Sequence, residues 1–335
     1  MCSLPIPIND IPWGYQTQQN IKTPKAPNPK LNPHQRTHHV MNSIDNIMNQ
    51  VLCSYNIINL TNLTETSAAT ADEVCQNLQQ RMNALATPFF PNATVLQDIL
   101  CTCDAIISGS STLHFILPIT TTVWKPKDLD LYVPHRYMKA LTTHLENLGY
   151  HKLPRNDILA NTAYLSSLQI LAVHKFILDE NVIDVVKSCT DAACSLIFQF
   201  HSTAVMNFVG ADTIISAYPN LTMQYKSLLN PYLIYKHAYN CTKISHLEKY
   251  RTRGFTFIPC RDSHASRFEC RSNGRTITDN GCLWIDLHTG LRKIQHPADI
   301  FRKFGILDVE WRLGGHVCES DCFLRPRIRI IEDKS

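Results

Sequence analysis

Two apolar stretches that lie close together in the sequence constrain the fold of this chain most. The first ends in Gly109-Ser110, and the second, residues 128–133, carries Asp128 and Asp130. Side chains in a β-strand alternate between its two faces, so a strand over 128–133 places both aspartates on one face. Two carboxylates held side by side repel each other in a partly desolvated site, so either they stay well solvated or a positive charge lies between them. Mg²⁺ fits this pair, because it binds one or two carboxylates and completes its shell with water and phosphate oxygens.

A tight turn from a strand into a helix is predicted at Gly109-Ser110. Gly109 has no side chain to block the approach of a phosphate, and Ser110 adds a hydroxyl donor. The first turn of the following helix offers free N–H groups and the positive end of the helix dipole. This turn therefore predicts a phosphate-binding element, and the alternative is an ordinary turn without a ligand.

A third carboxylate is predicted on a later strand. Residues 170–178 and 182–186 have the pattern of a β-hairpin joined by residues 179–181. Asp184 lies within the second strand, where burial of a carboxylate is unfavourable unless the carboxylate is paired or binds a metal ion. This cost favours Asp184 as an acidic ligand. The alternatives are that Asp184 faces water, or that Asp286 or Asp308, which occur in similar local sequence, takes this role.

Gly-Ser followed by Asp-x-Asp on an apolar strand, with a later strand aspartate, resembles the signature of the nucleotidyltransferase fold, the DNA polymerase beta-like superfamily. The resemblance covers residues 101–209 and is nearest to uncharacterised fungal members that pair DLDLYV with a later FHST segment, residues 200–203 here. Seventeen residues separate Ser110 from Asp128, a longer spacing than is usual in that superfamily.

The resemblance implies an α+β fold with a nucleotidyltransferase-like mixed sheet flanked by helices. It implies metal-dependent transfer of a nucleoside monophosphate from a nucleoside triphosphate to an acceptor that the sequence leaves open. Mg²⁺ (or Mn²⁺) is the implied cofactor. The residues implied in catalysis and metal binding are Asp128, Asp130 and Asp184. Those implied in nucleotide binding are Gly109 and Ser110. Lys125 and Lys127 lie beside the proposed metal site in the sequence and are further candidates for contact with the nucleotide; the alternative is that they are solvated.

Two other interpretations stay open. The chain is either a catalytically inactive protein of this fold that binds a nucleotide or a partner, or a scaffold in which the three aspartates do not converge. The long spacing before Asp128 favours the inactive interpretation. Coordinates that place Asp184 on the same face as Asp128 and Asp130 would argue against the scaffold.

Composition limits the partners and the compartment. A net charge of +4, from 32 basic and 28 acidic residues, is too small to indicate a nucleic-acid partner by itself, which stays open. No apolar run approaches the ~18 residues of a membrane span. The N-terminal residues lack a secretory signal pattern. We therefore expect no membrane partner and an intracellular, cytoplasmic or nuclear location, with most of the 13 cysteines as free thiols.

Four regions are predicted along the chain: a proline-rich disordered tail over 1–36, a helical N-terminal region over 37–100, the nucleotidyltransferase-like core over 101–209, and a helical and β extension over 210–335. Within the core, residues 138–148 predict an amphipathic helix that packs on the sheet face opposite the aspartates, and residues 193–209 predict a helix.

Several other features have weaker predictions. Cys260, His264, Cys270 and Cys282 leave a metal site open, although structural zinc sites usually have tighter spacing. Cys101 and Cys103 are expected to be buried thiols, and His201 a structural histidine.

Two basic segments are predicted in the extension. Residues 225–250 are predicted to be helical, and the end of this helix presents Arg251 and Arg253, either to a phosphate or to solvent. At the C-terminal end Arg327 and Arg329 alternate with isoleucines, which predicts an edge strand with the arginines facing water.

Overall fold

The computed structural model describes residues 47–154, 169–230, 241–259, 267–293, 296–316 and 322–332, and the structural statements below concern these residues. The predicted disordered tail over 1–36, Cys260 and His264 lie outside them.

The N-terminal part of the described chain is helical, as predicted. Residues 47–53 form a helical segment. The longer helices that follow are α2 (Ile57–Thr64), α3 (Ala68–Ala86), α4 (Ala93–Thr102), α5 (Gly109–Ile116) and α6 (Met138–Asn147), with α7 (Pro219–Met223), α9 (Cys241–Arg251) and α10 (Pro297–Phe304) later in the chain. Val74, Leu78 and Met82 of α3 are fully buried, as their spacing predicts. None of the helices among the described residues is long and apolar enough to span a membrane.

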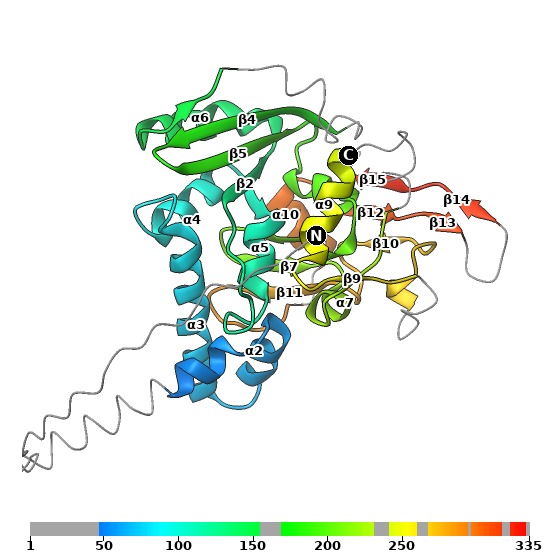
Figure 1. Cartoon of the computed structure of the whole chain (residues 1–335), viewed down its shortest axis with the longest axis horizontal. Helices are drawn as coiled ribbons and strands as arrows, with labels where there is room; N and C mark the ends of the chain where they lie inside the picture. The colour runs from blue at the N-terminus through cyan, green and yellow to red at the C-terminus, as the bar shows by residue number, and fades with distance from the viewer. Residues whose placement is uncertain are drawn as a thin grey trace, which may run out of the picture. The chain divides into compact units, whose positions relative to one another are not determined.

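One eight-stranded sheet forms the centre of the structure, in the order β11-β7-β6-β1-β2-β5-β4-β3 (Figure 1). Its strands are β1 (Ile106–Ser108), β2 (Asp128–Val133), β3 (His151–Lys152), β4 (Ile170–Leu178), β5 (Asn181–Ser188), β6 (Asn207–Val209), β7 (Thr213–Ser216) and β11 (Leu283–Asp286). β2 and β5 are parallel, and the other pairs in this sheet are antiparallel. The predicted α+β class, with a mixed sheet flanked by helices, is confirmed.

Smaller sheets complete the C-terminal region. A three-stranded sheet has the order β10-β12-β15, from Arg275–Thr276, Asp308–Arg312 and Arg327–Ile331. Two short pairs are β8 (Lys226–Ser227) with β9 (Thr256–Phe257), and β13 (Gly315–His316) with β14 (Phe323–Leu324). β7 and β11 carry the central sheet beyond residue 209, so the C-terminal region contributes to the same sheet as the predicted core.

The central sheet separates two hydrophobic clusters. Leu129, Leu131, Ile183 and Val185 belong to a cluster that includes the buried residues of α2–α6. Tyr132 and Val186, on the opposite face, belong to a cluster with η4 (Ala193–Gln199), α10 and β12. Helix α6 therefore packs on the face opposite the aspartates, as predicted.

Three local predictions are wrong. Residues 193–209 do not form one helix but two 3-10 helices, η4 and η5 (Thr203–Val205), followed by strand β6, because Asn207–Val209 pair with both β1 and β7. Residues 226–227, predicted helical, form strand β8. Cys103 is buried, but Cys101 is exposed, because the two residues lie at the end of α4 and only one of them faces the core.

Arg81 joins the N-terminal helices to α5. Its side chain is buried, with 3 % of its surface exposed. Its guanidinium donates to the Asn77 side chain and to the backbone carbonyls of Leu52, Tyr55, Phe115 and Leu117. Phe115 and Leu117 lie at the end of α5, and Leu52 and Tyr55 lie at the end of helix 47–53, so one cation contacts the carbonyls of both helix ends.

We predict that Arg81→Met lowers the free energy of unfolding by about 3 kcal/mol or more, because it leaves four backbone carbonyls without this donor. Urea denaturation measures the change. The exposed Arg302→Met serves as a control, with a change within about 0.5 kcal/mol. Equal stability of the two variants would contradict the role assigned to Arg81.

Candidate functional site

The pairing of β2 with β5 brings two of the predicted aspartates together. The two strands run parallel, and Asp130 pairs with Asp184 while Asp128 pairs with Val182. Paired residues on parallel strands point to the same face, so all three aspartates share one face of the sheet. Their apolar neighbours point into the helical cluster on the other face. The scaffold interpretation required Asp184 to lie far from the other two aspartates, whereas Asp184 is the cross-strand neighbour of Asp130.

Gly109 lies directly against Asp130. Its φ of +68° is a left-handed conformation that favours glycine. A Cβ atom at this position would lie 2.3 Å from Oδ2 of Asp130, which is too close for any side chain. The turn is also fixed to β2, because the Ser111 hydroxyl donates to the carbonyl of Asp128 at 3.0 Å. The predicted Gly-Ser turn and the predicted Asp-x-Asp strand are thus in contact.

The electrostatics of Asp130 are unusual. Burial raises the pKa of Asp130 to about 7, and repulsion from Asp128 and then Asp184 adds to this shift. The positive charges of Lys249 and Lys175 oppose it only in part. The carboxylates therefore form a site of excess negative charge, which favours a bound cation.

Lys175 is a member of this site that the sequence analysis missed. It lies on β4 opposite Asp184, and its Nζ is 2.8 Å from Oδ1 of Asp184. The sequence pattern predicts a three-residue connection over 179–181. In the structure Asp179-Glu180 alone join the two strands, and Asp179 has a φ of +52°. A two-residue connection shifts the hairpin register by one residue and pairs Lys175, rather than Phe176, with Asp184. Recognition of the shorter turn would have identified Lys175.

Helix α9 and the residue after its last turn supply further cations. Arg253 donates from Nη1 to the Ser110 hydroxyl at 2.8 Å, and its guanidinium lies 4.0 Å from the centre of the Trp124 ring. The Tyr250 side chain is also hydrogen-bonded to Ser110, and burial raises its pKa to about 12. Of the two arginines predicted at this helix end, Arg253 reaches the turn, while Arg251 pairs with Glu248 at the surface.

A buried histidine, His201, packs beside α9, next to His246 of that helix. Burial lowers the pKa of His201 to about 3, with contributions from His246 and Lys249. The His201 ring lies 5.5 Å from the Tyr250 ring and 6.1 Å from the His246 ring, measured between centroids. His201 is therefore neutral at physiological pH and packs behind α9, which fits the predicted structural histidine.

Other candidate residues lie elsewhere. Lys125 and Lys127 are exposed on the loop before β2, and among the described residues neither forms an ion pair with the three aspartates. Asp286 lies on β11, at the far edge of the central sheet, and Asp308 lies on β12 in another sheet. Neither of these two aspartates is a member of this site.

The predicted cysteine metal site gains no support from its described members. The Cys282 thiol lies 3.4 Å from Arg275 Nη2 and from the carbonyl of Thr276, and Cys270 lies beside Ser272. Burial raises the pKa of Cys282, which disfavours the thiolate that a metal ion binds.

The three aspartates supply the carboxylate oxygens that Mg²⁺ and Mn²⁺ take as ligands. Their arrangement is incomplete, however: over the described ranges no three His, Cys, Asp or Glu side chains are grouped closely enough to hold a metal ion. Asp184 is bound to Lys175 instead. The residues therefore fit a cation held by Asp128 and Asp130, with the remaining ligands from water or from a phosphorylated substrate.

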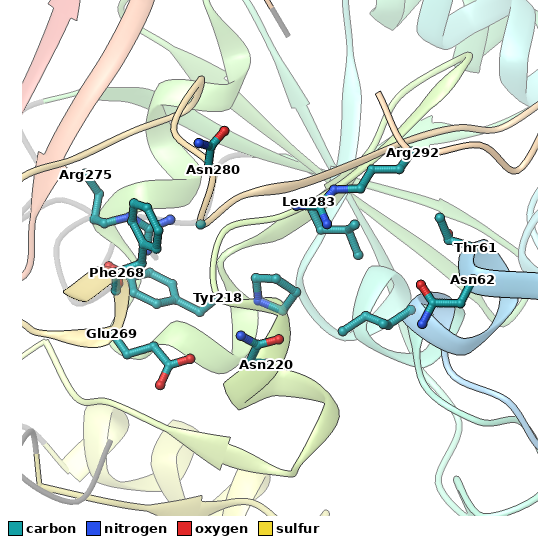
Figure 2. Close-up of a pocket in the computed structure, with 13 residues that line it drawn as sticks. Thr61, Asn62, Tyr218, Asn220, Phe268, Glu269, Arg275, Asn280, Leu283 and Arg292 are labelled. Carbon is teal, nitrogen blue, oxygen red and sulfur yellow. Dashed lines mark hydrogen bonds between the residues drawn. The ribbon is translucent and has the colours of Figure 1, made fainter. Parts of the chain in front are cut away.

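A separate cavity of about 330 Å³ lies between α2, α7 and the segment before β11. Figure 2 shows Arg275, Phe268 and Tyr218 on one side of it and Arg292, Thr61 and Asn62 on the other. None of the aspartates or turn residues of the candidate site lines this cavity. It is therefore separate from the candidate site and lies between the N-terminal helix α2 and segments of the C-terminal region.

We predict that Asp130→Asn changes the pH dependence of stability. Because the folded pKa of Asp130 is near 7 and an unfolded aspartate titrates near ~3.9, the wild-type protein loses stability as pH rises between these values. The variant should match the wild type near pH 4 and exceed its unfolding free energy at pH 8 by about 4 kcal/mol, since the two pKa values differ by about three units and each unit is worth ~1.36 kcal/mol. Urea denaturation at both pH values measures this, with exposed Asp72→Asn as the control. A difference that does not depend on pH would contradict the raised pKa.

Comparison of this chain with models of known protein families, with curated proteins and with solved structures finds no match. The functional assignment therefore depends on the geometry of the aspartates, the glycine turn and the surrounding cations.

Proposed function

We propose that this protein is a metal-dependent nucleotidyltransferase, which moves a nucleoside monophosphate from a nucleoside triphosphate to a hydroxyl of an acceptor. The observation that carries the proposal is the parallel, in-register pairing that sets Asp130 beside Asp184, with Asp128 on the same face and Gly109 against Asp130. Side chains that attract a divalent cation thus lie next to a turn whose backbone can approach a phosphate.

The surrounding positive charges support a polyphosphate substrate. Lys249 and Lys175 act on Asp130 from two different elements, and Arg253 contacts Ser110 of the turn. A triphosphate adds negative charge to a site that already holds carboxylates, more than one divalent cation can offset, so basic residues nearby lower the cost of binding it. Lys125 and Lys127, predicted to contact the nucleotide, are exposed on the loop that leads into β2. In this proposal the loop approaches the bound nucleotide, and the two lysines contribute positive charge to its phosphates.

In the proposed reaction the acceptor oxygen attacks the α-phosphorus, and the bond to the bridging oxygen of the β-phosphate breaks. Pyrophosphate leaves, and the proton of the acceptor hydroxyl passes to a carboxylate of the site. Asp184 would orient the acceptor hydroxyl, while Asp128 and Asp130 would hold Mg²⁺, or Mn²⁺. The bound cation would neutralise charge on the attacking and leaving oxygens.

The test is an incubation of the full chain with α-labelled nucleoside triphosphates, Mg²⁺ and a panel of acceptors. We expect label transfer in the wild type and a loss of about 100-fold or more in Asp128→Asn, because that variant removes charge at the reacting phosphate. Asp72→Asn, on an exposed position of α3, should retain full transfer. Calorimetry with Mg²⁺ and nucleotide gives a second readout, and equal affinity in the wild type and Asp128→Asn would contradict the metal role.

The ion pair between Lys175 and Asp184 favours a second candidate function, a nucleotide-binding module without turnover. A lysine that occupies the third carboxylate keeps it from a metal ion or from an acceptor hydroxyl. In this case the protein binds nucleotide with one cation at Asp128 and Asp130 but transfers no label to any acceptor.

We predict that Lys175→Met raises the affinity for Mn²⁺ by about tenfold, equivalent to ~1.4 kcal/mol, because it frees Asp184 and removes a positive charge. Calorimetric titration with Mn²⁺ measures this effect. Lys139→Met, which removes an exposed lysine of α6, should leave the affinity unchanged. An unaltered affinity in Lys175→Met would show that the ion pair does not restrict the site, and label transfer by the wild type would exclude the inactive module.

A further inference from the structure

Several arginines lie on one face of the small C-terminal sheet, where Glu310 is the acidic residue among them. Strand β15 pairs with β12 so that Arg327 lies opposite Arg312 and Arg329 lies opposite Glu310. Ile328 and Ile330 pack against the hydrophobic cluster of the C-terminal region, so the alternating arginines point away from it. Arg325, Arg327 and Arg329 are exposed, as predicted for an edge strand. Figure 1 shows this sheet on the side of the molecule away from helices α2–α4.

The arrangement places like charges against each other. Arg312 and Arg327 are direct cross-strand partners, and such pairs of equal charge destabilise a sheet. The guanidinium of Arg312 is held by the carbonyl of Arg325, to which Nε and Nη2 donate at 3.3 and 3.2 Å. Within the described ranges no salt bridge joins any of the four arginines to an acid.

Protection of the sheet edge explains only part of this pattern. Charged side chains on an edge strand prevent another strand from adding to it, which accounts for Arg327 and Arg329. Arg312 lies on β12, the middle strand of the order β10-β12-β15, where no edge needs protection. A bound anion would relieve the repulsion between Arg312 and Arg327.

We propose that Arg312, Arg325, Arg327 and Arg329 bind the phosphodiester backbone of a nucleic-acid strand. Alternate residues of a β-strand are about 6.6 Å apart, so the arginines form a regular row of cations. The planar guanidinium donates two parallel hydrogen bonds to a phosphate, which suits arginine for this role. The row extends across two strands, so a polyanion that lies over the face of the sheet can contact all of it. An acidic peptide that pairs with the open edge would lie beside β15 alone and would not reach Arg312 on β12. This surface does not depend on the proposed nucleotidyl transfer.

The experiment measures fluorescence anisotropy of labelled single-stranded RNA and DNA of the same sequence with the full chain, at several salt concentrations. Arg327→Gln/Arg329→Gln should lower the affinity at low salt at least tenfold. It should also reduce the slope of log K against log salt by about 1.4, since each lost contact to a single strand accounts for ~0.7. Arg312→Gln should lower the affinity as well.

The control is Lys139→Gln/Arg302→Gln, which removes the same charge from exposed positions on α6 and α10. It should lose little affinity, and the melting temperature of the arginine variants should be unchanged or higher, because repulsion is reduced. Absence of binding by the wild type at low salt would overturn the proposal. So would equal losses in the control and the arginine variants, or binding of polyglutamate as tight as that of the oligonucleotides.

Discussion

The parallel pairing of β2 with β5 is the constraint on which the rest of the site depends. Parallel neighbours need a long connection, and here residues 134–180 supply it with α6 and strand β4. The register of this pair sets Asp130 beside Asp184, and the alternation of side chains turns the apolar residues of both strands into the helical cluster. The same pairing therefore gives the structure its core and gathers the carboxylates.

Three neighbouring carboxylates repel each other, and this repulsion has an energetic cost. Basic residues on other elements of the structure reduce that cost. Lys175 on β4 and Lys249 on α9 reduce the repulsion at Asp130 without removing it, since the pKa of this residue stays near 7. Desolvation and the charges of the two neighbouring aspartates raise the pKa of Asp130 by more than the two lysines lower it. A site with this imbalance binds a cation more favourably than one in which every carboxylate has its own basic partner.

Much of the central architecture follows from local sequence patterns. The strand before Gly109, the helix after it, the strand at 128–133, the helix over 138–147 and the hairpin partners near 170–178 and 181–188 all form as expected. These elements have strong hydrophobic periodicity and clear turn residues, so interactions between residues close in the sequence determine where they form. The placement of Asp184 on the same face as Asp130 was also expected.

The remaining features depend on contacts between distant segments. Residues 193–209 have an apolar composition that fits a helix, but pairing of Asn207–Val209 with two strands outweighs that preference. The contact of Arg253 with Ser110 joins residues 143 positions apart, which no local pattern reveals. The turn at Asp179 decided whether Lys175 or its neighbour faces Asp184, so one residue of loop length changed the composition of the site.

Helix α5 is held at both of its ends by charged side chains. At its beginning the Asp130 carboxylate lies against Gly109, and at its end the guanidinium of Arg81 binds the carbonyls of Phe115 and Leu117. An anion at the first residue and a cation at the last both match the dipole of the helix. Two distant elements, α3 through Arg81 and β2 through Asp130, therefore both contact α5, so the position of the glycine turn depends on α3 as well as on the strand that carries the aspartates.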